Sequence, residues 1–176
     1  MNNLAVIRQR QWTDEELAQA GFTYYNRQKQ LVLARKLPAA EAPKIIQASW
    51  ATLTAEAGMI ICYNPKTYAA MSSLDDYDHW PVQPEIFAQD YAPWDDPERT
   101  STPAEIHLIK AGCNPYYKKA GAWARQLTEP TYVQSLESQE PVQYPPGAWL
   151  CIGSKGEPWA QDDNAFRSRY IINDDA

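Results

Sequence analysis

Histidine and cysteine are scarce in this chain of 176 residues, which holds two histidines and three cysteines. Cys62, Cys113 and Cys151 cannot all pair within one chain, and no Cys-x-x-Cys motif occurs, so the sequence predicts a reduced protein of the cytoplasm. Two histidines are little material for a two-histidine metal site or a histidine-based catalytic triad. We therefore expect neither a cofactor nor a dedicated metal centre.

Long apolar runs are missing too, and the chain does not begin with the basic and apolar regions of a signal peptide, so we expect no membrane span. Basic charge is in deficit. Sixteen lysines and arginines face 22 acidic residues, which gives a net charge of −6 and a pI of about 4.9. This acidic balance argues against a nucleic-acid-binding protein.

Aromatic residues with a polar atom are abundant instead. The chain has seven Trp and eleven Tyr beside three Phe. Such rings suit half-buried positions and binding surfaces. Hydrophobic residues make up 44% of the chain, which is enough for a folded core.

Two helix starts of the same kind are present. Thr13 precedes Glu16 and Thr102 precedes Glu105 with the spacing of a capping box, in which each side chain satisfies a free backbone amide of the other residue. A glycine then predicts a left-handed helix end, and a tyrosine pair follows it. These residues are Gly21 with Tyr24-Tyr25, and Gly112 with Tyr116-Tyr117.

Further matches follow in the same order. Residues 31–37 and 122–127 read as strands that share the pattern Ala-Arg-x-Leu. Glycine then opens a second matched strand in each half, at 58–62 and at 147–151. The closing aromatic residues have identical spacing, namely Trp80, Phe87 and Tyr91 against Trp159, Phe166 and Tyr170. A Phe and a Tyr four residues apart lie on one face of a helix.

These matches predict an α+β protein made of two diverged copies of one module, each a short curled sheet with a capped N-terminal helix and a closing helix. The predicted organisation is an N-terminal arm at 1–12, a first copy at 13–93, an acidic proline-containing linker at 94–101, a second copy at 102–172 and an acidic tail at 173–176.

The second copy carries additional short motifs. They are Ala124-Arg125-Gln126-Leu127, Pro146-Gly147-Ala148-Trp149-Leu150, the turn Gly153-Ser154-Lys155-Gly156-Glu157, Trp159, and the closing Phe166 and Tyr170. This series resembles the small bacterial and phage module often called PGDYG. Ala148 stands where that module usually has Asp, and the first copy lacks the Gly-x-Lys-Gly-Glu turn. The resemblance implies a fold unit more than a function.

Arg35 and Arg125 occupy equivalent strand positions and share a strand face with apolar residues. A guanidinium placed there needs a carboxylate, a helix C-terminus or an aromatic face. We expect both to be mostly buried and bonded within their own copy, the alternative being an anion-binding pocket. Lys155 lies in a glycine-flanked turn that lacks the spacing of a Walker loop, so we interpret it as a hairpin turn, the alternative being a site where its amides bind a phosphate. Trp80, Trp159, Tyr91 and Tyr170 are candidates for the core and for a partner-binding platform.

The acidic segment beside Trp80 offers oxygen ligands to a hard cation, but it has no EF-hand pattern, so we interpret it as a solvated loop. It contains Asp75, Asp76, Asp78 and His79. His107, in the second capped helix, is expected on the helix surface. Cys62 and Cys151 hold matching strand positions, which is typical of small buried hydrophobic residues.

The function predicted from these features is a non-catalytic interaction module that binds a protein partner. An alternative is an enzyme or ligand-binding protein with a site for a small anionic ligand between the two copies, to which Arg35, Arg125, Lys155 and the 75–79 segment would contribute. A further alternative is a binder of single-stranded nucleic acid through exposed Trp and Tyr, against which the net charge argues.

Overall fold

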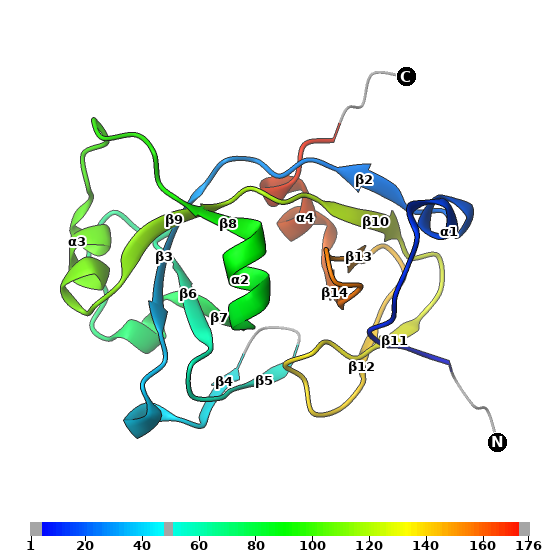
Figure 1. The fold of residues 1–176 in the computed structure, drawn as a ribbon, viewed down its shortest axis with the longest axis horizontal. Coiled ribbons are helices and arrows are strands. Elements are labelled where there is room, and N and C mark those ends of the chain that lie inside the picture. The colour runs from blue at the N-terminus through cyan, green and yellow to red at the C-terminus, as the bar shows by residue number, and fades with distance from the viewer. Residues whose placement is uncertain (1–4, 48–50, 173–176) are drawn as a thin grey trace. The chain divides into compact units, whose positions relative to one another are not determined.

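The computed structural model describes residues 5–47 and 51–172 (Figure 1). It is a mixed α+β structure, mostly sheet, with several small sheets and four α-helices in the described part of the chain. The chain forms two compact units. Unit 1 combines the described residues up to Gln28 with those from Ala120 onward, and unit 2 is Lys29–Lys119. No helix among the described residues is long and apolar enough to cross a membrane.

Unit 2 is built on a five-stranded antiparallel sheet with the order β7-β6-β3-β9-β8. Its strands are β3 (Leu31–Lys36), β6 (Ile60–Asn64), β7 (Asp78–Val82), β8 (Tyr91–Pro93) and β9 (Asn114–Lys118). A separate two-stranded sheet pairs β4 (Lys44–Gln47) antiparallel with β5 (Thr52–Ala55). The helices are α2 (Pro84–Asp90) and α3 (Pro103–Lys110), with the 3-10 turns η1 (Ala39–Glu41) and η2 (Leu74–Asp76).

The two faces of this sheet carry different cores, because successive side chains of a strand point to opposite faces. Leu33, with Ile61 and Tyr63, packs with Ala104 and Leu108 of α3. Val32 and Ala34 pack on the other face, against α2. The aromatic residues on that second face are Trp80, Phe87, Tyr91 and Tyr116.

Unit 1 is built on a four-stranded antiparallel sheet with the order β14-β13-β10-β2. Its strands are β2 (Thr23–Tyr25), β10 (Ala122–Gln126), β13 (Trp149–Ile152) and β14 (Pro158–Gln161). A second sheet has the order β1-β11-β12, with β1 (Val6–Ile7) parallel to β11 (Thr131–Val133) and β12 (Val142–Tyr144) antiparallel to it. The helices are α1 (Asp14–Gln19) and α4 (Asp163–Arg169).

The two predicted capping boxes are confirmed. Thr13 and Glu16 exchange side-chain bonds with each other's amides at the start of α1, and Thr102 and Glu105 do so at the start of α3. Gly21 and Gly112 follow with φ of +89° and +102°, a conformation that favours glycine. Trp80 and Trp159 both lie in strands, each opposite a cysteine of the neighbouring strand.

The sheets of the two units share one register. In unit 2, Ala34 pairs with Cys62 and Lys36 with Ile60. In unit 1, Ala124 pairs with Cys151 and Gln126 with Trp149. In unit 2, β9 lies between β3 and β8, and in unit 1, β2 lies at the end of its sheet beside β10. The module boundaries at 13–93 and 102–172 stay a prediction, and the tail at 173–176 lies outside the described residues.

Candidate functional site

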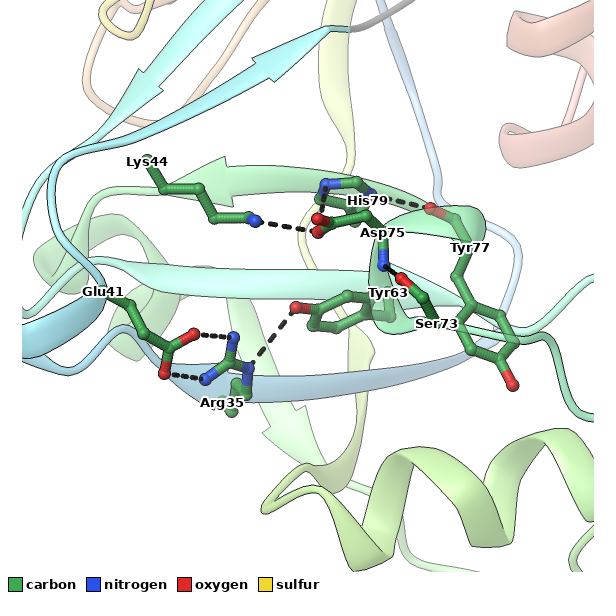
Figure 2. A network of polar contacts seen from close by, with 8 residues as sticks. All are labelled: Arg35, Glu41, Lys44, Tyr63, Ser73, Asp75, Tyr77 and His79. Atoms are coloured by element: carbon green, nitrogen blue, oxygen red, sulfur yellow. Dashed lines mark hydrogen bonds and ion pairs between the residues drawn. The ribbon is translucent and has the colours of Figure 1, made fainter.

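A polar network in unit 2 is centred on Arg35 (Figure 2). The guanidinium donates to both carboxylate oxygens of Glu41, from Nη1 over 3.0 Å and from Nη2 over 2.9 Å. Its Nε lies 3.4 Å from the hydroxyl of Tyr63. The side chain is 11% exposed. The Glu41 carboxylate, followed by Tyr63, raises the pKa of Arg35 above its ordinary value, although burial opposes this. Arg35 therefore stays charged, and its bonds to Glu41 and Tyr63 fix the position of its guanidinium.

His79 and Asp75 join the same network (Figure 2). The His79 ring stacks on Tyr63, with centroids 5.5 Å apart and planes at 18°. Its Nδ1 is 2.7 Å from the Tyr77 carbonyl oxygen, which can only accept, so Nδ1 carries the proton. Asp75 accepts from Lys44 over 2.8 Å, and this bond holds the pKa of its carboxyl below the usual value.

The other acidic residues of this segment point to separate partners. Asp76 accepts from the amide of Ser73 at the start of η2, and Asp78 pairs with Lys66 at 3.2 Å. Among the described residues, no group of three or more His, Cys, Asp or Glu side chains could hold a metal ion. The segment is an ion-paired surface whose carboxylates diverge.

His107 has a role that sequence reasoning missed. The Tyr77 hydroxyl accepts from the amide of Met71 over 2.9 Å and lies 2.8 Å from Nδ1 of His107. Tyr77 is buried and His107 half-buried, so His107 lies at the surface of α3 but has one ring nitrogen bonded to a buried side chain. The one sequence signal was Tyr77 itself, an aromatic residue within an acidic run.

The opposite sheet face of unit 2 contains a hollow of about 450 Å³. Its lining is aromatic and apolar apart from Lys36, Arg35 and Asn114. Phe87 forms one wall and meets Tyr116 edge to face, with centroids 4.9 Å apart. Tyr91 stacks on Phe87 at 4.7 Å. The remaining lining residues are Ala34, Pro38, Ile60, Ala111 and Gly112.

In unit 1, Trp149 pairs with Gln126 as Ile60 pairs with Lys36 in unit 2. Its indole lies on the ring of Phe166, with centroids 4.1 Å apart and planes at 6°, and meets Tyr25 edge to face at 5.6 Å. Its Nε1 donates to Asp163 over 2.9 Å. Tyr170 stacks on Phe166 at 4.7 Å. Unit 1 therefore holds a stack of three rings, whereas unit 2 holds the stacked pair Phe87 and Tyr91.

The remaining aromatic candidates belong to the cores. Tyr91 and Tyr170 are 8% and 1% exposed, and burial raises the pKa of Tyr170. Trp80 and Trp159 are half-buried beside Cys62 and Cys151. All three cysteines are buried, and burial raises the pKa of Cys113 to about 11. A thiol with that pKa is a poor nucleophile at neutral pH.

Arg125 behaves differently from Arg35. It is half-buried in unit 1, and its guanidinium carbon lies 5.2 Å from the centre of the Phe22 ring. Its buried Nε has no hydrogen-bond partner among the described residues. The expected bond to a carboxylate or carbonyl is found for Arg35 but not for this Nε. The physical reason is Phe22, which offers an aromatic face instead.

Lys155 lies in the turn between β13 and β14, in unit 1. Its own amide donates to the Glu157 carboxylate over 2.9 Å. That carboxylate also sits where a Cβ on Gly153 would be, at 2.2 Å. The Lys155 amide is therefore bonded within the turn, to Glu157. The close approach of this carboxylate explains the glycine at 153, and both features fit the hairpin interpretation of the motif.

No protein-family model, no curated protein and no solved structure matches this chain.

Proposed function

We propose that the chain consists of two diverged copies of one module. Support comes from bonds that recur at equivalent places. Gly58 and Gly147 each donate to the leucine that ends the preceding strand segment, Leu37 and Leu127 respectively. Lys119 donates to the carbonyl of Asp90, as Gln28 does to that of Arg169. We also propose that the second copy shares its ancestry with the PGDYG module, which it resembles.

The copies also exchange their first helix and strand. In unit 1, β2 runs antiparallel to β10, and in unit 2, β9 runs antiparallel to β3. In a module that folded alone, β2 would pair with β3, and β9 would pair with β10, each pair forming a hairpin. Here β2 continues into β3 and β9 continues into β10. This connectivity is that of reciprocal segment exchange, a low-cost route to a paired arrangement.

We propose that the protein is a non-catalytic interaction module, and that the hollow of unit 2 receives a side chain of a partner protein. One observation carries this. Ile60 stands at the register position where Trp149 completes the aromatic stack of unit 1. The replacement leaves an apolar hollow with Phe87 as its wall. A concave apolar surface with few polar groups is the usual form of a binding site.

The alternative, a site for a small anionic ligand, has one feature in its favour. Arg35, Lys44 and His79 belong to one network of unit 2. However, Glu41 already takes the guanidinium and Asp75 the ammonium. An external anion would have to displace a bonded carboxylate at both cations. The network therefore supports a structural role that fixes η1 and η2 on the sheet.

The proposed function is tested by peptide selection. A random peptide library is displayed and selected on the full chain, and each selected peptide is then measured against the Ile60→Trp variant. Ile45→Trp is the matched control, because Ile45 is 55% exposed on β4 and does not line the hollow. We expect binding to be lost only with Ile60→Trp. Peptides that bind all three proteins equally would contradict the proposal.

A further inference from the structure

We infer that the hollow of unit 2 takes a planar aromatic side chain of a partner polypeptide that carries carboxylates beside that ring. This inference rests on the proposed function and adds the chemistry of the ligand. Unit 1 provides the geometry for the ring, and Lys36 provides the preference for negative charge.

The ring is inferred from the stacks of the two units. In unit 1, one face of Phe166 is covered by Tyr170 and the other by Trp149. In unit 2, Tyr91 covers one face of Phe87 at 4.7 Å, and the hollow lies against the same ring. Tyr116 is placed edge-on to Phe87 as Tyr25 is to Phe166, at 4.9 and 5.3 Å. A flat ring entering the hollow would therefore meet the surroundings that already hold an indole in unit 1.

The charge is inferred from the residue that pairs with Ile60. Lys36 is exposed, lines the hollow and forms no ion pair with a described residue. Among the residues that the structure describes, no aspartate or glutamate lines the hollow. Gln126, its counterpart in unit 1, is neutral and donates to the Gly147 carbonyl over 3.0 Å. An ammonium at the rim of an apolar hollow favours a ligand with a nearby carboxylate.

The source of the ring is inferred from the rim. Lys36, Pro38, Gly112 and Asn114 line the hollow and are exposed. An exposed rim allows a ring to enter while the backbone that bears it stays in solvent. In unit 1 the ring that stacks on Phe166 is that of Trp149, which is likewise a side chain of a polypeptide. We therefore assign the site to a peptide segment rather than to a free aromatic acid.

The test is isothermal titration calorimetry with capped pentapeptides on the full chain. Gly-Glu-Trp-Glu-Gly is compared with Gly-Lys-Trp-Lys-Gly and Gly-Glu-Ala-Glu-Gly, and free indole-3-acetate is the small-molecule arm. We expect the acidic tryptophan peptide to bind about three-fold or more tighter than the basic one, which is the scale of an exposed ion pair. The alanine peptide should not bind. Lys36→Gln should remove the charge preference, and Ile60→Trp should remove binding.

Each contrary result has a separate meaning. Equal binding of the acidic and basic tryptophan peptides overturns the charge preference, and tighter binding of indole-3-acetate overturns the peptide source. If no tryptophan peptide binds while selected peptides still bind and lose affinity in Ile60→Trp, this inference fails and the proposed function stands. Lys36 is exposed, so Lys36→Gln tests the charge even if Ile60→Trp does not fold.

Discussion

The indole of Trp149 lies flat on the ring of Phe166, with centroids 4.1 Å apart, and is 6% exposed. Trp149→Ile would copy the unit 2 residue into unit 1 and leave a cavity. We expect it to lower the free energy of unfolding by about 2–4 kcal/mol, somewhat less than a full truncation of a buried aromatic residue. The reverse change, Ile60→Trp, fills an existing hollow and should cost less than about 1 kcal/mol. Urea denaturation measures both, and equal costs would contradict the equivalence of the two positions.

Arg35 and Arg125 provide a matched pair. Arg35→Met removes two bonds to Glu41 and the contact to the Tyr63 hydroxyl, so it should destabilise the protein by about 1–3 kcal/mol. Arg125→Met removes a guanidinium that rests on Phe22 and whose Nε is unbonded, so it should cost less. Thermal unfolding compares the stability of the two variants. A larger loss of stability from Arg125→Met would refute the structural role given to Arg35.

Glu137 predicts a pH dependence of stability. Burial, aided by the nearby Glu157, raises the pKa of Glu137 to about 7 from 4.5. The folded state therefore holds this proton more tightly than the unfolded chain does. Stability from this group is fully present below pH 4.5 and is lost as the pH rises through 7. We expect Glu137→Gln to raise the free energy of unfolding by about 1–3 kcal/mol at pH 8 and to leave it unchanged at pH 4. An equal effect at both pH values would show that Glu137 titrates normally.

The exchange of segments predicts how a single copy behaves. Residues 102–176 contain α3 and β9 followed by β10, with only Lys119 to Gly121 between the two strands. A short hinge disfavours folding back, so we expect the fragment to form a dimer in which each chain supplies β9 to the other. Light scattering after gel filtration measures its mass. A fragment with Gly-Asn-Gly inserted after Lys119 is the control and should be a monomer. A monomeric unmodified fragment would argue against exchange.

Part of the fold can be predicted from the sequence. The capping boxes at Thr13 and Thr102 predict α1 and α3, and the alternation around Ala34 and Ala124 predicts β3 and β10. These features are local, since they depend on residues within one turn or one strand. The two-residue strand β1 is held by its pairing with β11 and has no such pattern of its own.

The long-range relationships were not predictable in the same way. Two similar copies offer β10 two similar strands to pair with, and the residues alone do not choose between β9 and β2. Glu41 was not foreseen as the partner of Arg35, because it lies in a 3-10 turn beyond the strand that carries Arg35. The hollow, in contrast, had a signal in the sequence, since the matched segments 58–62 and 147–151 have Ile60 at the position where the other segment has Trp149.

The most direct test of the account moves the site from one unit to the other. The double variant Ile60→Trp with Trp149→Ile closes unit 2 and opens unit 1. Backbone ¹H–¹⁵N spectra of the wild type and of this variant are recorded during titration with the acidic tryptophan peptide. The account predicts shifts around Phe87 and Tyr116 in the wild type, and around Phe166 and Tyr25 in a folded double variant. Shifts that remain around Phe87 in the variant, or that lie elsewhere in the wild type, would contradict it.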